Sequence, residues 1–466
     1  MIPTKLNTTS RSSEIDLHTI LSNQNKEELI KIILDLSDDN PDIEKQLLFK
    51  YTPQKDEISS AKKLITASIN GAKRKGFIDW RQVGPALQGA ELTLQKAQEK
   101  VAKGKWESAV LLALAVMPPV VKMLNFSDDS NGSIGDVMNW AIRTIDVAVT
   151  TSLPNLNDKE KKGLFDAIIK EALKAHYDGW SDWRYALLKT CTNYSPVKDL
   201  RIKLEKQLES LQSRPESTWH DRYEKTQIKL LQFEIIVRCD GADRAEKFIY
   251  ENILESEFRE KAIALELGKG DYKKVIQLCL DGEEADKVYR GLVHKWKEYR
   301  YQAYEMIGDI EQQKQLAREL LFTNEFSYYL KLKELYPANE WDFALKKIVD
   351  DFNKMDYQPS VYLSILKEEN LTAELLIYCQ NHISTITDLY QYLIKNNLEE
   401  VNELFTKYIE YSAEEATDRK KYRTVCSIIK TYKKACGTIH SHKLIGELRE
   451  KYKRRPAFIE ELGKIR

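Results

Sequence analysis

"ELGKGDYKKVIQLCL" (residues 266–280) and "YEMIGDIEQQKQLAREL" (residues 304–320) each place a Gly-Asp pair between two runs whose apolar residues recur at three and four positions. Gly270 and Gly308 lie 38 positions apart. A glycine just past a helix adopts a left-handed conformation without a Cβ clash, which suits the tight turn of a helical hairpin. Helical repeats have periods of about 34 to 47 residues, so this spacing predicts stacked helix pairs.

Helical periodicity extends over almost the whole chain, and strict alternation of strand length is rare. The sequence therefore predicts an all-α protein. We expect a flexible N-terminal leader over residues 1–24, a globular helical domain over 25–211, and an α-solenoid of degenerate TPR/HEAT-like helix-turn-helix repeats over 212–466. In the globular domain we expect an aromatic core formed by Phe77, Trp80, Trp106, Trp140, Trp180, Trp183 and Tyr185.

The start of the first long helix carries a clear signal. Asn25 followed by Glu28 is the pattern of a capping box, in which each side chain bonds the other residue's backbone N–H. "KGKWESAVLLALAV" (residues 103–116) repeats the glycine turn at Gly104, between two further helices.

Composition restricts the kind of protein. The 466 residues contain 72 Lys and Arg against 72 Asp and Glu, which argues against a protein that coats nucleic acid or an anionic membrane over its whole surface. The six cysteines are widely separated and mostly lie in apolar runs, as buried free thiols do. This pattern is typical of a protein in the reducing cytoplasm. No secretory signal and no stretch of about 20 apolar residues is evident, so we expect a cytoplasmic protein with no membrane contact.

"SDDSNGSIGDVM" (residues 127–138) has nearly the spacing of a calcium-binding loop. However, Ser127 stands where the first carboxylate belongs, and Met138 replaces the bidentate glutamate. A capping box of Ser133 and Asp136 at the start of an amphipathic helix explains the stretch better, so we expect a helix and no calcium site.

"CGTIHSH" (residues 436–442) groups Cys436, His440 and His442, and Cys436 with His440 would share the face of a continuous helix. A structural zinc site needs four ligands, and no fourth ligand is evident nearby. Gly437 also disfavours a continuous helix. We therefore predict no metal site. Phosphate-binding loops and hydrolase or metalloprotease motifs are not found either, so the sequence predicts a non-enzymatic protein without a cofactor.

The charge is unevenly distributed. Residues 418–466 hold 15 basic and 5 acidic side chains, and the rest of the chain is correspondingly acidic. This basic end could dock on the acidic body of the chain, on an acidic partner or on nucleic acid, or it could serve solubility alone. The candidate interaction residues are Arg419, Lys420, Lys421, Arg423, Lys453, Arg454 and Arg455.

Five spaced blocks resemble the long helical region of bacterial SWIM zinc-finger proteins: "KEELIKIILDLSDDNPDIEKQLL", "KGFIDW", "SDDSNGSIGDVM", "KGDYKKVIQLCL" and "YKRRPAFIEELGKI". The likeness runs from about Asn25 to the end, and Arg454, Arg455 and Pro456 match the terminal block. The family's Cys-x-Cys and Cys-x-His finger has no counterpart here. The resemblance therefore implies the helical part alone, and an indirect association with the helicase-like ATPases to which bacterial members are linked.

These observations predict a helical-repeat scaffold that mediates protein-protein interaction, with a partner segment lying along the repeat array. The alternative is a nucleic-acid-associated accessory protein that binds through its basic C-terminal region.

Overall fold

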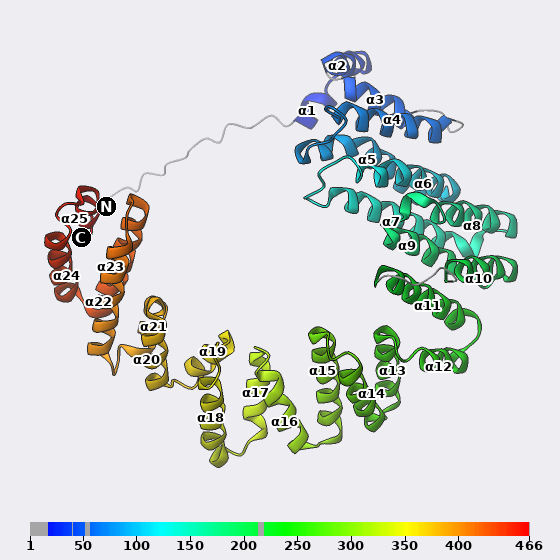
Figure 1. Ribbon diagram of the computed structural model, residues 1–466. Coiled ribbons are helices and arrows are strands. Elements are labelled where there is room, and N and C mark those ends of the chain that lie inside the picture. Colours follow the sequence, from blue (N-terminus) through cyan, green and yellow to red (C-terminus); the bar gives the residue numbers. More distant parts are fainter. Residues whose placement is uncertain (1–16, 40, 52–55, 213–218, 466) are drawn as a thin grey trace, which may run out of the picture. The chain divides into compact units, whose positions relative to one another are not determined.

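The computed structural model describes residues 17–39, 41–51, 56–212 and 219–465. These residues form 25 α-helices (Figure 1). Within them, β contacts are limited to two isolated bridges, Arg74 with Phe77 and Ile78 with Ser127. The predicted fold class, an all-α helical-repeat solenoid, is confirmed.

The chain divides into two compact units, Met1–Glu255 and Ser256–Arg466. This division lies later than the boundary expected at residues 211/212. The reason is that α11 (Trp219–Cys239) packs on α9 (Ser181–Thr192) and α10 (Lys198–Gln212), and α12 (Ala242–Glu251) packs on α11. The expected leader also differs, because Leu17–Ser22 form the short helix α1. Residues 1–16 lie outside the described residues.

The first unit is built on helices that pack with their chain neighbours and with the helix after next. The Asn25–Glu28 capping box is confirmed, with both backbone-to-side-chain hydrogen bonds formed at the start of α2. The remaining helices of this unit are α2 (Lys26–Asp39), α3 (Pro41–Tyr51), α4 (Glu57–Ala72), α5 (Trp80–Ala102), α6 (Trp106–Met123), α7 (Ser133–Ser152) and α8 (Asp158–Ala172).

Helix α6 is the centre of the first core. Eleven of its 18 residues are buried, because α4, α5 and α7 all pack against it. Among the described residues it is also the one helix that is long and apolar enough, by length and composition, to cross a membrane, and 61% of that stretch is buried. Its length falls just short of the about 20 apolar residues typical of a span. Its burial in this core accounts for its apolar composition.

Aliphatic side chains make up most of this core, and of the expected aromatic cluster Trp140 and Trp183 pack against it half-buried. Tyr185 is buried as expected, but the side chains of Phe77, Trp80 and Trp180 are exposed by 51%, 46% and 46%. Each of these three lies at or just before the start of a helix, on the side that faces solvent. The prediction of an aromatic core was therefore wrong for these three residues.

Close approach of α4 and α5 depends on Gly89. A Cβ at this position would lie 2.8 Å from both the Leu64 carbonyl oxygen and the Ser68 Oγ. A buried ion pair ties the same two helices together, since Lys100 Nζ lies 2.7 Å from the Glu57 carboxylate.

The second unit is a run of helices that pack mainly on their neighbours in the chain. Its helices are α13 (Ser256–Lys269), α14 (Tyr272–Ala285), α15 (Arg290–Ile307), α16 (Ile310–Leu321), α17 (Phe326–Leu335), α18 (Ala338–Asn353), α19 (Ser360–Glu368), α20 (Thr372–Asn381), α21 (Ile386–Leu393), α22 (Leu398–Glu415), α23 (Arg419–Cys436), α24 (Thr438–Lys451) and α25 (Pro456–Gly463).

The two Gly-Asp pairs form the predicted turns. Gly270 has φ 75° between α13 and α14, and Gly308 has φ 73° between α15 and α16. In both turns the aspartate then caps the next helix: Asp271 accepts from the Lys274 backbone N–H at 3.1 Å, and Asp309 from that of Gln312 at 3.2 Å. Each pair therefore both ends one helix and begins the next.

The second core is richer in aromatic and polar contacts. Trp296 is fully buried and donates its indole N–H to Asp286 at 2.8 Å, and Arg259 pairs with the same carboxylate at 3.1 Å. Gly282 makes room for this cluster, because a Cβ there would lie 2.9 Å from the Trp296 ring. Arg300 holds Glu283 with two hydrogen bonds of 2.7 and 3.0 Å.

All six cysteines are free thiols, and five of them are buried. Burial raises the pKa of Cys279 to about 12, and that of Cys426 and Cys436 to about 11. These thiols therefore stay protonated at neutral pH. Because the thiolate is the reactive form of cysteine, they react slowly.

Candidate functional site

The seven predicted interaction residues meet at one end of the last helices. Arg419, Lys420, Lys421 and Arg423 lie in the first turns of α23, and Lys453, Arg454 and Arg455 lie in the turn between α24 and α25. Arg455 reaches the carbonyl of Ala416, three residues before Arg419. The structure therefore brings together two groups that lie far apart in the sequence.

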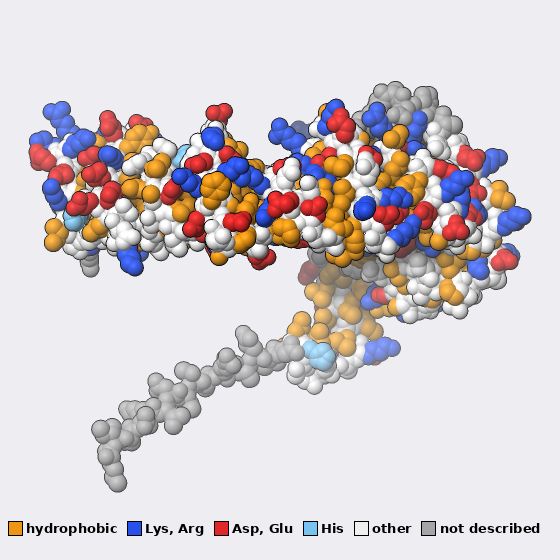
Figure 2. Space-filling model, turned by 90° about the horizontal axis from the view of Figure 1, so that it is seen from below, with side chains coloured by type: hydrophobic (Ala, Val, Ile, Leu, Met, Phe, Trp, Pro, Cys, Tyr) orange, Lys and Arg blue, Asp and Glu red, His pale blue; other side chains and the backbone are white. Residues whose placement is uncertain are grey.

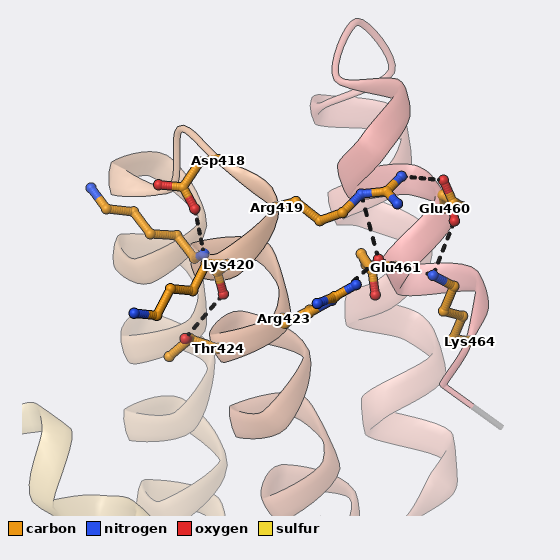
Figure 3. A network of polar contacts seen from close by, with 9 residues as sticks. Asp418, Arg419, Lys420, Arg423, Thr424, Glu460, Glu461 and Lys464 are labelled. Atoms are coloured by element: carbon orange, nitrogen blue, oxygen red, sulfur yellow. Dashed lines mark hydrogen bonds and ion pairs between the residues drawn. The ribbon is translucent and has the colours of Figure 1, made fainter.

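Two of the arginines bind the last helix. Arg419 pairs with Glu460, and its Nε lies 3.7 Å from Glu461, while Arg423 lies 3.6 Å from Glu461 (Figure 3). Lys464 completes the network, at 2.9 Å from Glu461. The hydrogen bond from Lys464, together with the two arginines, lowers the pKa of Glu461 below its ordinary value. These cations therefore fasten α25 to α23.

Arg455 has a structural contact as well. Its Nη1 donates to the carbonyls of Ala413 and Ala416 at 2.9 and 3.0 Å, and its guanidinium lies over the Tyr452 ring. The last carbonyls of a helix have no intrahelical donor, so Arg455 supplies one at the end of α22. Lys453 pairs with Glu450 at 2.8 Å on the surface.

Three of the seven cations have weak contacts or none. Lys421 donates to the Glu415 carbonyl over 3.4 Å. The Lys420 and Arg454 side chains have no hydrogen-bond or ion-pair partner among the described residues, and Lys420 points away from Glu460 and Glu461 (Figure 3). The basic end thus offers fewer free cations than its composition predicts.

The stretch that resembles a calcium loop is a helix start. α7 begins at Ser133, as predicted, but the expected Ser133–Asp136 capping box does not form. Instead, Gly132 turns the chain with φ 71°, and the Asp129 carboxylate accepts from the Ile134 N–H at 3.1 and 3.2 Å. The carboxylate that would serve a cation therefore caps the helix.

The Cys-Gly-Thr-Ile-His-Ser-His stretch forms a helix junction. α23 ends at Cys436, Gly437 has φ 88°, and α24 begins at Thr438, so Cys436 and His440 do not share one continuous helix. His440 Nδ1 lies 3.0 Å from the Cys436 carbonyl. Over the described ranges, no three His, Cys, Asp or Glu side chains are grouped closely enough to hold a metal ion.

A solvent-open groove in the first unit was not anticipated from the sequence. It has a volume of about 720 Å³ and runs between α4, α6 and α8. We call it the lysine groove, defined by its lining residues Ile58, Lys62, Thr66, Leu111, Leu114, Ala115, Pro118, Pro119, Lys122, Ala167, Lys170, Glu171 and Lys174.

One acidic side chain, Glu171, lines the lysine groove, and its hydrogen-bonding capacity is taken. It accepts from Lys174 at 2.6 Å, from Tyr177 Oη at 3.2 Å, and contacts His176 Nε2 at 3.0 Å. Burial lowers the pKa of His176 despite this carboxylate. Glu171 therefore serves the fold at the groove's edge.

Comparisons with known proteins leave the family open. No family model matches the chain, and no curated protein matches it. A solved structure described as a "Circular tandem repeat protein with novel repeat topology and enhanced subunit contact surfaces" is 12% identical, over 90% of this chain and 94% of that chain, with a TM-score of 0.22. A TM-score this low supports no functional conclusion. The resemblance to SWIM proteins stays a prediction.

Proposed function

We propose that this chain is a non-enzymatic helical-repeat scaffold that binds another protein along its second unit. The observation that carries the proposal is the stacking of α13–α25, in which most helices pack mainly on their chain neighbours. A stack of this kind has an extended surface that a partner segment can follow over several repeats.

The surface chemistry supports a protein partner. The side chains of Met306, Phe343, Tyr357, Tyr411 and Ile439 are exposed by 59% or more, and they recur along the whole unit. On the face seen in Figure 2, basic, acidic and apolar side chains alternate and no large area of one charge is present. Protein interfaces combine apolar contacts with a polar rim, whereas nucleic-acid interfaces are strongly basic.

The alternative, binding of nucleic acid through the basic C-terminal region, has less support. Arg419, Arg423 and Arg455 are occupied by Glu460, Glu461 and backbone carbonyls. Phosphate contacts require cations that are free to exchange their counterions. The resemblance to SWIM proteins adds one class of partner to look for, a helicase-like ATPase.

The test is a pull-down of the tagged full chain from the cells that produce it, after treatment with a lysine-reactive cross-linker. Half of the sample is digested with nuclease, and both halves are analysed by mass spectrometry. The expected result is a protein partner that survives nuclease and is cross-linked to exposed lysines of the second unit, such as Lys346, Lys347 and Lys395.

Two outcomes would overturn the proposal. One is recovery of no protein above a control that carries the tag alone. The other is loss of every partner after nuclease, which would transfer the function to nucleic-acid association.

A further inference from the structure

The lysine groove is made from one face of each of three helices. α6 contributes positions 111, 114, 115, 118, 119 and 122, α4 contributes 58, 62 and 66, and α8 contributes 167, 170 and 171, while Lys174 lies in the turn just after α8. These spacings of three and four residues place each set on a single side of its helix. Apart from Lys174, the groove is therefore lined by the faces of well-packed helices.

The charge of the groove is uncompensated. Lys62, Lys122 and Lys170 are exposed, and none of them forms an ion pair with a described residue. Lys174 is neutralised by Glu171. Three like charges therefore line one groove with no ion pair to a described carboxylate, and a bound anionic group would relieve their repulsion.

The floor of the groove offers acceptors and apolar contact. Pro118 and Pro119 lie inside α6 and have no N–H to donate to the carbonyls four residues earlier, those of Leu114 and Ala115. Both of these residues line the groove. A ligand with N–H donors can bond such carbonyls, while Ile58 and Leu111 provide apolar contact.

We infer that the lysine groove binds an extended acidic peptide segment of a partner protein. Carboxylates would pair with Lys62, Lys122 and Lys170, backbone N–H groups would face the proline-freed carbonyls, and apolar side chains would lie between them. This inference rests on the proposed function, because the peptide segment belongs to a partner that the scaffold binds. It adds a binding contact in the first unit.

A peptide fits better than a nucleic acid. The lining residues include no aromatic side chain, and single-stranded nucleic acids are held by stacking of bases on aromatic rings. The Leu114 and Ala115 carbonyls, which lack a proline N–H donor, can accept from amides but repel phosphate oxygens. The groove's volume of about 720 Å³ also matches a short segment of chain rather than a duplex.

The experiment uses the full chain and a fluorescein-labelled decapeptide of alternating Glu and Leu, with binding followed by fluorescence anisotropy. The neutral comparison peptide has Gln in place of Glu. The groove variant is Lys62→Glu with Lys122→Glu and Lys170→Glu. The matched control is Lys63→Glu with Lys159→Glu and Lys162→Glu, which makes the same charge change on exposed positions of α4 and α8 that do not line the groove.

The acidic peptide is expected to bind more tightly than the neutral one. The groove variant should weaken its binding by at least about tenfold, because glutamates repel it, and the control variant should have a clearly smaller effect. Circular dichroism spectra and melting temperatures of both variants should match those of the parent, which separates lost binding from lost folding.

Equal binding of the two peptides, or equal losses in the two variants, would overturn the inference. Binding of a ten-nucleotide oligo(dT) at the same lysines, without binding of the acidic peptide, would overturn it as well. The proposed function fails separately. If the groove variant fails to bind the peptide but native partners are still recovered by pull-down, the scaffold has a contact elsewhere. If the peptide binds while no native partner is recovered, peptide binding by the groove is supported and the proposed scaffold function is overturned.

Discussion

Helices α6 and α15 have the same length, 18 residues, but they are used differently. Eleven residues of α6 are buried, nearly all of them aliphatic, whereas α15 buries four: Trp296, Tyr301, Ala303 and Tyr304. α6 is enclosed by α4, α5 and α7, while α15 packs chiefly on α14 and α16. The first unit therefore depends on tight aliphatic packing around one helix, and the second on large anchors and polar links between neighbours.

The largest effect is expected at the anchor of α15. Trp296→Ala removes a fully buried ring and leaves Asp286 without its indole donor, which should lower the free energy of unfolding by about 3–5 kcal/mol. Because helices of the second unit pack mainly on their neighbours, hydrogen exchange should accelerate in α13–α16 and much less in α22–α25.

Trp80→Ala is the control, because this half-exposed ring should matter by only about 0.5 kcal/mol. If Trp296→Ala loosens α22–α25 as much as α13–α16, the second unit is one cooperative block and the contrast with the first unit disappears.

A smaller effect is expected where α5 meets α4. Gly89→Ala would place a Cβ 2.8 Å from the Leu64 carbonyl oxygen, so the two helices must separate, at a cost of about 1–3 kcal/mol. Gly84 lies in the same helix with open space around it, so Gly84→Ala should stabilise the unit by about 0.5–1 kcal/mol. Denaturant unfolding of each variant measures both. If both variants changed the free energy of unfolding in the same direction, the first unit would be less closely packed than the burial of α6 indicates.

Removing the helix cap at either Gly-Asp turn of the second unit should lower stability modestly. Asp271→Ala and Asp309→Ala remove helix caps and should each cost about 0.5–2 kcal/mol, while Asp→Asn at either position should be nearly neutral. Hydrogen exchange at the first turns of α14 and α16 reports the loss. An asparagine variant as damaging as the alanine one would mean that charge, and not capping, is what each turn requires.

The smallest effect is expected at the end of the chain and depends on pH. Lys464, Arg419 and Arg423 lower the pKa of Glu461, so its stabilising contribution is fully present above the ordinary carboxylate value of 4.5 and is lost as the pH falls through the lowered pKa. Glu461→Gln should reduce protection of the α25 amides at neutral pH, and the difference from the parent should close in acid.

Glu450→Gln serves as the comparison for this last change. Glu450 pairs with Lys453 on the open surface, where ion pairs contribute little. A loss of α25 protection in this variant equal to that in Glu461→Gln would remove the special role of the α23–α25 network.

Much of the fold could be predicted from local sequence. The turns at Gly270 and Gly308, the Asn25–Glu28 capping box and the place of Pro456 in the first turn of α25 all depend on residues a few positions apart. The exposure of Trp80 and Trp180 could not be predicted in this way, because composition does not say which side of a helix start faces solvent.

The candidate sites depend on contacts between distant segments, and so they were predicted less well. Arg455 was expected on a free basic surface, but it binds carbonyls about 40 positions earlier in the chain. The lysine groove requires the faces of three helices to meet. Its one local signal was the Pro118–Pro119 pair inside an apolar run, which marks two carbonyls deprived of their donors.

The buried cysteines can serve as native probes of local opening. Cys191 lies in α9, Cys279 in α14, Cys379 in α20 and Cys426 in α23, so each reports on a different stretch of helices. A thiol enclosed in this way is alkylated only during the moments when its surroundings open. The order in which the four cysteines are alkylated would therefore give the order in which the surrounding helices open, without any introduced probe.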